Sequence, residues 1–133
     1  MANVNITNNI PSSWHMSRTD LTNLVENSLG KLNTDTNCIV EIIFATRPTI
    51  QRLNRQFRNK DYPTDILSFP QIRIPGEQLC LLGSLVVCPA VVREKRESPA
   101  DVIKHGLLHL LGYDHETNES LWNEKANIIN CEM

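Results

Sequence analysis

One run of the chain, HGLLHLLGYDH, holds three of its four histidines and sets the strongest constraint on the fold. His105 and His109 stand four residues apart in the apolar stretch 102–111, which predicts a helix with both imidazoles on one face. Gly112 can end that helix in the left-handed conformation, which residues with a Cβ adopt less readily. The sequence therefore predicts a helix and a turn that carry His115 round to the other two histidines.

Three converging imidazoles form the ligand set of a catalytic zinc ion, which keeps a fourth position open. A single histidine on an apolar face is more often a core residue, and a pair at this spacing can be coincidence. A third histidine after a glycine turn, in a chain with only one other, favours a metal site. We therefore expect one zinc ion per chain, bound by His105, His109 and His115.

The same positions nearly match the zinc-protease pattern H-E-x-x-H-x-x-G-x-x-H. The histidines and Gly112 fall in register, but Gly106 stands where such a protease carries the glutamate that activates water. A downstream Met-turn is also missing, because the only later methionine is Met133. A metallopeptidase is thus disfavoured, and the metal must serve other chemistry or another base.

Length and composition indicate one folded domain spanning residues 1–133. The chain is long enough for a hydrophobic core and too short for two ordinary domains, and its net charge of −2 gives no global nucleic-acid signal. No apolar run approaches a membrane span, and the start lacks the features of a signal peptide. The four cysteines suggest no disulfide framework, which fits a reducing compartment. We expect a cytoplasmic protein with no membrane partner.

Hydrophobic periodicity predicts short strands that alternate with helices. The strands are expected at 4–6 (at an edge of the sheet), 38–44, 66–69 and 81–87, and residues 71–78 are expected to form an exposed loop or hairpin tip. Gly83, inside the last strand, indicates a place where another backbone or a ligand comes close. The helices are expected after the cap Ser17, from Arg47, from Pro89, from Pro99 with Ser98 as its cap, and after Thr117 or Asn118, where Trp122 faces the core. This order predicts an α+β domain, in which helices flank a small mixed β-sheet and the metal site lies on a late helix and the following turn.

The helix predicted from Arg47 has an unusual exposed face. Ile50, Leu53 and Phe57 mark its buried side. Residues 47–60 contain no acidic residue and five basic ones: Arg47, Arg52, Arg55, Arg58 and Lys60. A charge run is usually only a solvated face, but five uncompensated cations in an acidic protein suggest an RNA phosphate partner. Both interpretations stay open at this stage.

Three blocks resemble the YbeY family of metal-dependent endoribonucleases. They are the histidine run, then LN at 53–54 with RNKDYPTDILSFP at 58–70, and more weakly LG at 82–83 leading into VVC at 86–88. The resemblance implies a single domain with a small mixed sheet, zinc held by His105, His109 and His115, and a catalytic arginine at Arg58. It also implies single-strand-directed RNA cleavage, in maturation of the 3′ end of small-subunit (16S-type) ribosomal RNA and in ribosome quality control. The small ribosomal subunit or its assembly factors are then the expected partners, and DNA is not.

Two departures from the family pattern stand out. Ser84 occupies a position where the family usually has an acidic residue, and the segment between Cys88 and His105 is shorter than usual. If the family carboxylate orients the cleft or serves as a base, this chain must do without it. The shortened segment bears on the wall of the cleft on that side and on the choice of RNA.

The chemistry of the candidate site can proceed by two routes. Arg58 can bind the scissile phosphate, while zinc either lowers the pKa of a water nucleophile or polarises the phosphate for attack by the 2′-hydroxyl. Asp114 can orient an imidazole or cap the next turn, and Asp65 can pair with Arg58 or close its own turn. The competing functions are a zinc metallopeptidase and a non-catalytic ribosome-associated module with a structural zinc.

Overall fold

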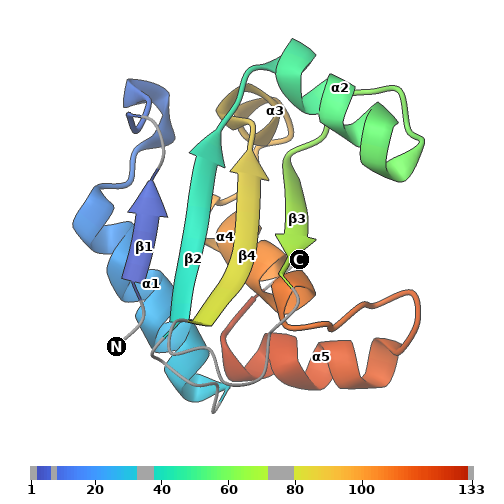
Figure 1. The fold of residues 1–133 in the computed structure, drawn as a ribbon. Coiled ribbons are helices and arrows are strands. Elements are labelled where there is room, and N and C mark those ends of the chain that lie inside the picture. Colours follow the sequence, from blue (N-terminus) through green and yellow to red (C-terminus); the bar gives the residue numbers. More distant parts are fainter. Residues whose placement is uncertain (1–2, 7–8, 33–37, 72–79, 132–133) are drawn as a thin grey trace.

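The computed structural model describes residues 3–6, 9–32, 38–71 and 80–131 (Figure 1). Its elements alternate as the sequence predicts, and they form one small α+β domain. In chain order they are β1 (Asn3–Ile6), the 3-10 turn η1 (Ser12–Trp14), α1 (Arg18–Lys31), β2 (Cys38–Phe44), α2 (Arg47–Arg58), β3 (Ile66–Pro70), β4 (Cys80–Val87), α3 (Pro89–Glu94), α4 (Pro99–Leu110) and α5 (Glu119–Ile128).

The four strands form a mixed sheet in the order β1-β2-β4-β3. β1, β2 and β4 run parallel, and β3 pairs antiparallel with β4. β1 lies at one edge, as its short alternating pattern predicts. β3 lies at the other edge, so one side of this strand pairs with β4, while its other side has no strand partner among the described residues and can border a cleft.

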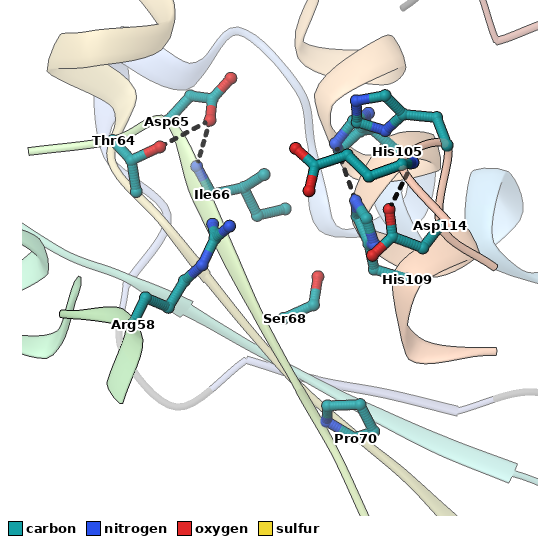
Figure 2. A pocket seen from close by; sticks show the side chains of 11 residues that line it. Arg58, Thr64, Asp65, Ile66, Ser68, Pro70, His105, His109 and Asp114 are labelled. Carbon is teal, nitrogen blue, oxygen red and sulfur yellow. Dashed lines mark hydrogen bonds between the residues drawn. The ribbon is translucent and has the colours of Figure 1, made fainter. Parts of the chain in front are cut away.

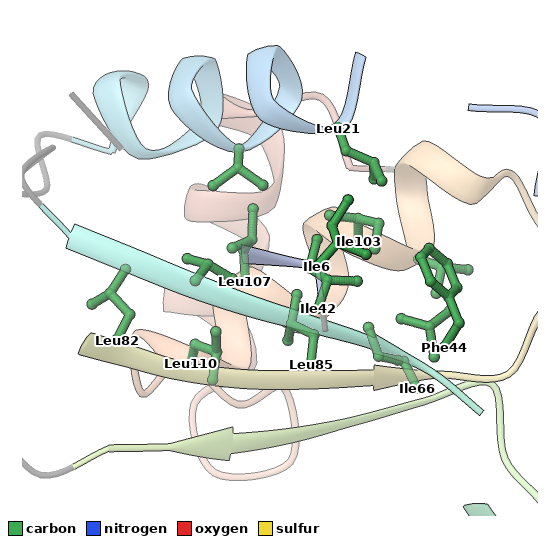
Figure 3. Close-up of a cluster of buried hydrophobic side chains, with 14 of the residues drawn as sticks. Ile6, Leu21, Ile42, Phe44, Ile66, Leu82, Leu85, Ile103, Leu107 and Leu110 are labelled. Carbon is green, nitrogen blue, oxygen red and sulfur yellow. The ribbon is translucent and has the colours of Figure 1, made fainter. Parts of the chain in front are cut away.

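The two faces of the sheet are covered by different helices. On one face, α1 and α4 bury Leu21, Ile103 and Leu107 against Ile42 and Leu85 of the central strands (Figure 3). On the opposite face, α2 and α3 pack over a smaller cluster, which includes Ile50, Leu67, Val86 and Val91. Alternation along β4 explains this division, because successive strand residues point to opposite faces.

Two glycines allow close approaches at the β3 side of the sheet. A Cβ at Gly106 of α4 would lie 2.6 Å from Ile66 Cδ1 and 2.9 Å from Leu85 Cδ2. A Cβ at Gly83 would collide with the carbonyl oxygen of Phe69, which confirms the prediction that another backbone comes close there. The glycine at 106 therefore lets α4 lie directly against β3.

Some sequence expectations fail or fall outside the described residues. Cys38, the first residue of β2, is disulfide-bonded, so the expectation of no disulfide is wrong. The loop predicted at 71–78 lies outside the described residues, apart from Gln71. Among the helices that the structure describes, none has both the length and the apolarity to cross a membrane.

Candidate active site

Local capping and packing fix the position of the histidine helix. Ser98 Oγ accepts a hydrogen bond from the first turn of α4, as predicted for an N-cap. At the other end Gly112 is left-handed, with φ +91°, and its N–H donates to the carbonyl of His109 at 3.0 Å. Tyr113 N–H donates to the carbonyl of Leu108 at 3.0 Å, which closes the helix end. The predicted helix and its glycine cap are therefore confirmed.

The structure brings the three histidines together around one tryptophan. The Nε2 atoms of His105 and His109 are 3.2 Å apart, and the ring centroid of His115 lies 6.3 and 6.4 Å from theirs. The buried ring of Trp122, from α5, lies 5.0, 5.0 and 5.4 Å from the three imidazole centroids. The sequence predicts Trp122 as a core residue but gives no sign that it packs beneath all three histidines.

The spacing of the first two imidazoles fits a tetrahedral zinc ion. Zinc–nitrogen bonds of 2.0–2.1 Å place two ligand nitrogens about 3.3 Å apart, close to the observed distance. The ring of His115 lies farther away. Among the described residues, no group of three or more His, Cys, Asp or Glu side chains is already arranged to hold a metal.

The environment of His105 and His109 favours the neutral form of both imidazoles, because it lowers the pKa of each. Burial, with a smaller contribution from neighbouring His109, lowers the pKa of His105 to about 4, although the charge of Asp65 opposes the shift. Burial also lowers the pKa of His109, against the opposing charge of Asp114. Neutral imidazoles have the free lone pair that a metal ligand requires.

A cleft of about 400 Å³ connects the histidines to Arg58. Figure 2 shows Arg58 on one side, His105 and His109 on the other, and Ser68 of β3 between them. Ser68 Oγ donates a hydrogen bond to the carbonyl of Gly106 at 3.1 Å, which joins β3 to α4 at the base of the cleft. The sequence blocks that contain the arginine and the histidines therefore meet at one site.

The end of α2 differs from the prediction at Phe57. This side chain was expected on the buried face with Ile50, but it is 59% exposed. The last turn of α2 extends past the edge of the sheet (Figure 1), and the ring of Phe57 packs edge-on against Phe69 of β3, with ring centroids 5.3 Å apart. The next residue, Arg58, lines the cleft and helps lower the pKa of His109 through its charge.

The other basic residues of α2 are not all free of counter-charge. Arg47 pairs with Glu94 of α3 at 2.6 Å, and Arg55 pairs with Asp61 at 3.8 Å. Among the five cations only Arg58 lines the cleft; Arg52 and Lys60 are exposed, and the described residues give neither an ion pair. Tertiary structure thus supplies partners that local composition does not reveal.

The two candidate aspartates both make turn contacts. Asp65 Oδ1 accepts hydrogen bonds from Ile66 N–H at 2.7 Å and from Thr64 Oγ1 at 3.2 Å. In the described part of the chain, Asp65 forms no ion pair with Arg58. Asp114 Oδ1 accepts from Glu116 N–H at 2.8 Å, so it caps the turn that follows the helix.

Glu97 interacts with Asp65, which lines the cleft, and the sequence does not indicate this interaction. Burial, together with a hydrogen bond to Asp65 and the charge of Asp65, raises the pKa of Glu97 to about 7. Burial also acts to raise the pKa of Asp65, but the hydrogen bond with Glu97 and the charge of Lys95 outweigh it, and the net shift is downward. Glu97 Oε2 is buried without a hydrogen-bond partner among the described residues. The carboxyl groups of Glu97 and Asp65 therefore interact beside the cleft, and their pKa values shift in opposite directions.

The serine that departs from the family pattern does not face the histidines. Ser84 shares a face of β4 with Val86, on the α2 side of the sheet, and its Oγ donates to Glu41 Oε1 at 2.8 Å. Its position has no direct bearing on the cleft.

Comparisons with known proteins identify the family and the fold of the chain. A family model described as Endoribonuclease YbeY matches residues 3–128. A protein named endoribonuclease YbeY from a Sulfurihydrogenibium species is 37% identical over 107 residues, which cover 74% of this chain and 70% of that protein. One of the same name from a Sulfurovum species is 43% identical over 105 residues, covering 71% of each. The solution structure of TM1509 from Thermotoga maritima matches 98% of this chain and 87% of that one, with a TM-score of 0.57 and 26% identity.

Proposed function

The chain belongs to the endoribonuclease YbeY family, so it is an RNA-cleaving hydrolase. We propose that it cuts single-stranded RNA in the cleft that lies between Arg58 and the histidines. The observation that carries the proposal is the cleft itself, in which a guanidinium faces two imidazole nitrogens spaced as zinc ligands. A phosphodiester needs a cation for its oxygens and an activating group beside it, and the two sides of the cleft offer both.

Within this proposal His105, His109 and His115 hold one zinc ion. Bound there, zinc would supply Lewis-acid chemistry, either by lowering the pKa of a water nucleophile or by polarising the scissile phosphate. Arg58 donates two hydrogen bonds to the phosphate and offsets the charge that develops on its oxygens. Asp65 and its hydrogen-bonded partner Glu97 hold the turn from which β3 enters the cleft.

The natural substrate that we propose is the 3′ end of small-subunit ribosomal RNA, with a further part in ribosome quality control. The small subunit or its assembly factors would present this RNA. A cytoplasmic location belongs to the same proposal, and it rests on the RNA substrate alone, because the disulfide at Cys38 removes the support from cysteine content.

Packing weighs against the peptidase alternative. A glutamate at position 106 would have to displace Ile66 and Leu85, since even a Cβ there lies within 2.9 Å of both side chains. The position points into the sheet, so it has no room for the base of a zinc protease.

The non-catalytic alternative is tested by chelation, because loss of a structural zinc unfolds the protein and loss of a catalytic zinc leaves most of the fold intact.

The decisive experiment compares Arg58→Ala with Arg52→Ala at matched zinc content. Arg52 is an exposed arginine of the same helix that does not line the cleft, so it controls for the loss of one positive charge. Arg58→Ala should lower the rate of single-stranded RNA cleavage about 100- to 1000-fold, the typical effect of removing one charge-stabilising donor. Arg52→Ala should stay within a few-fold of the wild type. If Arg58→Ala and Arg52→Ala cleaved RNA at the same rate, Arg58 would have no role in the reaction. If the wild type still cleaved RNA in the presence of a chelator, the metal would have no role.

A further inference from the structure

An exposed aromatic surface at the end of α2 is not used by the chemistry proposed above. Phe57 is 59% exposed, and Tyr62, in the loop that leads to β3, is 52% exposed. Asn54 Nδ2 donates to the carbonyl of Tyr62 at 2.9 Å, which ties this loop to α2. The ring of Phe57 meets Phe69 edge-on, with ring centroids 5.3 Å apart. Large exposed aromatic groups beside a cleft commonly mark a binding surface.

This surface begins where the cleft ends. Ser68 and Pro70 line the cleft, while Phe69 between them belongs to the cluster on the opposite face of the sheet, as strand alternation requires. Because β3 is an edge strand, the two faces adjoin around its free edge. A strand of RNA that leaves the phosphate site beside Arg58 and passes over this edge therefore meets the ring of Phe57.

The charges near the ring favour a nucleic acid over a protein partner. Lys60 is exposed in the loop that follows the end of α2, and the described residues give it no ion pair. The pair between Arg55 and Asp61 is exposed on both sides and spans 3.8 Å, so a phosphate can compete for the arginine. Stacking rings within a basic surface are the usual elements of single-strand recognition.

We propose that Phe57, backed by Phe69, is a base-stacking subsite for a nucleotide that flanks the scissile phosphate of single-stranded RNA, an inference that rests on the proposed function. Stacking on a side chain requires a base that is free of its own neighbours. A duplex keeps its bases stacked and paired, so this subsite favours single strands without reading their sequence.

The test measures binding of the zinc-loaded protein to a fluorescein-labelled adenine-rich RNA of about twelve nucleotides, comparable to the span of single-strand sites. Methylated 2′-hydroxyls block cleavage by the route in which the 2′-hydroxyl attacks, and a gel after each titration checks that the RNA has not been cut by the water route. The matched control ligand is an abasic oligonucleotide of the same length, which keeps the phosphates and lacks the bases. Phe57→Leu keeps an apolar side chain over Phe69 but removes the π face, whereas Phe57→Trp keeps and enlarges it.

Phe57→Leu should bind the RNA about 5- to 150-fold more weakly than the wild type, the range for one lost stacking contact. Its affinity for the abasic oligonucleotide should not change. Phe57→Trp should bind at least as tightly as the wild type, and its added tryptophan emission should fall when RNA binds. Equal RNA affinities of wild type and Phe57→Leu, with wild-type cleavage intact, would overturn the subsite and leave the proposed function standing. The subsite would also be overturned if Phe57→Trp bound RNA while its tryptophan emission stayed unchanged. A wild type that neither binds nor cleaves RNA would overturn both.

Discussion

Replacing Gly106 by alanine tests whether contact between α4 and β3 sets the geometry of the cleft. The new Cβ would lie 2.6 Å from Ile66 Cδ1 and 2.9 Å from Leu85 Cδ2, whereas carbon atoms in ordinary contact stay about 3.5–4.0 Å apart. Relief requires either that these two buried side chains change rotamer or that α4 moves away from β3 by about 1 Å. The second response would also stretch the hydrogen bond from Ser68 Oγ to the carbonyl of Gly106.

The expected change in stability is the difference between two opposing effects. Overpacking of a buried site costs about 1–3 kcal/mol. Alanine in place of glycine inside a helix recovers about 1 kcal/mol. We therefore expect Gly106→Ala to lower the free energy of unfolding by about 1 kcal/mol and the melting temperature by about 3–6 °C. The rate of RNA cleavage should also fall although the protein stays folded, because His105 and His109 move with α4 while Arg58 does not.

Gly30→Ala is the matched control for helix propensity. Gly30 lies in α1, and an added Cβ there has no heavy atom within 4 Å, so the substitution changes propensity without changing packing. It should raise the free energy of unfolding by about 0.5–1 kcal/mol. Urea unfolding followed by circular dichroism gives both values. If Gly106→Ala gained as much stability as Gly30→Ala and cleaved RNA at the wild-type rate, the close approach of α4 to β3 would not constrain the site.

Three further predictions concern the site residues. His109→Ala should lose most bound zinc, and elemental analysis that finds undiminished zinc would rule out the assigned ligands. The raised pKa of Glu97 makes the free energy of unfolding fall as pH rises from about 4.5 to about 7, whereas the lowered pKa values of His105 and His109 make it rise over the same range. The contribution of Glu97 is therefore measured as a difference: relative to Glu97→Gln, the wild type should lose about 1 kcal/mol across this window, after allowance for solvent screening. A difference between the two proteins that does not change with pH would contradict the raised pKa of Glu97. Added Co²⁺ should quench the emission of Trp122, which packs against all three imidazoles, and the response should vanish in Trp122→Phe, where Trp14 remains as a buried reference away from the site.

Features that depend on a few neighbouring residues could be predicted from the sequence. The caps at Ser17, Ser98 and Asn118 and the left-handed Gly112 occur as expected, because each needs only its own turn of backbone. The grouping of the histidines follows for the same reason, since helix periodicity and one glycine cap largely determine it.

Features that depend on distant parts of the chain could not be predicted. Phe57 continues the apolar stripe of α2, and its exposure depends on where the sheet ends, which no local pattern encodes. The pair between Glu97 and Asp65 joins residues from two separate connections. The face taken by Ser84 depends on the register shift between Ile39 and Val40 of β2, which leaves an additional residue in β4 and reverses the alternation beyond it.

The place of β3 in the sheet explains how two sequence blocks on opposite faces can share one substrate. α2 packs on one face and α4 on the other, and an interior strand would separate Arg58 from the histidines by the full thickness of the sheet. At an edge strand the two faces adjoin, so a guanidinium at the end of α2 and imidazoles on α4 can reach the same phosphate around five residues of backbone. The same edge is where the path from the cleft to Phe57 must run. A short antiparallel strand that ends at Pro70 suits this position, because proline at the end of an edge strand limits pairing with other chains and leaves the edge open to RNA.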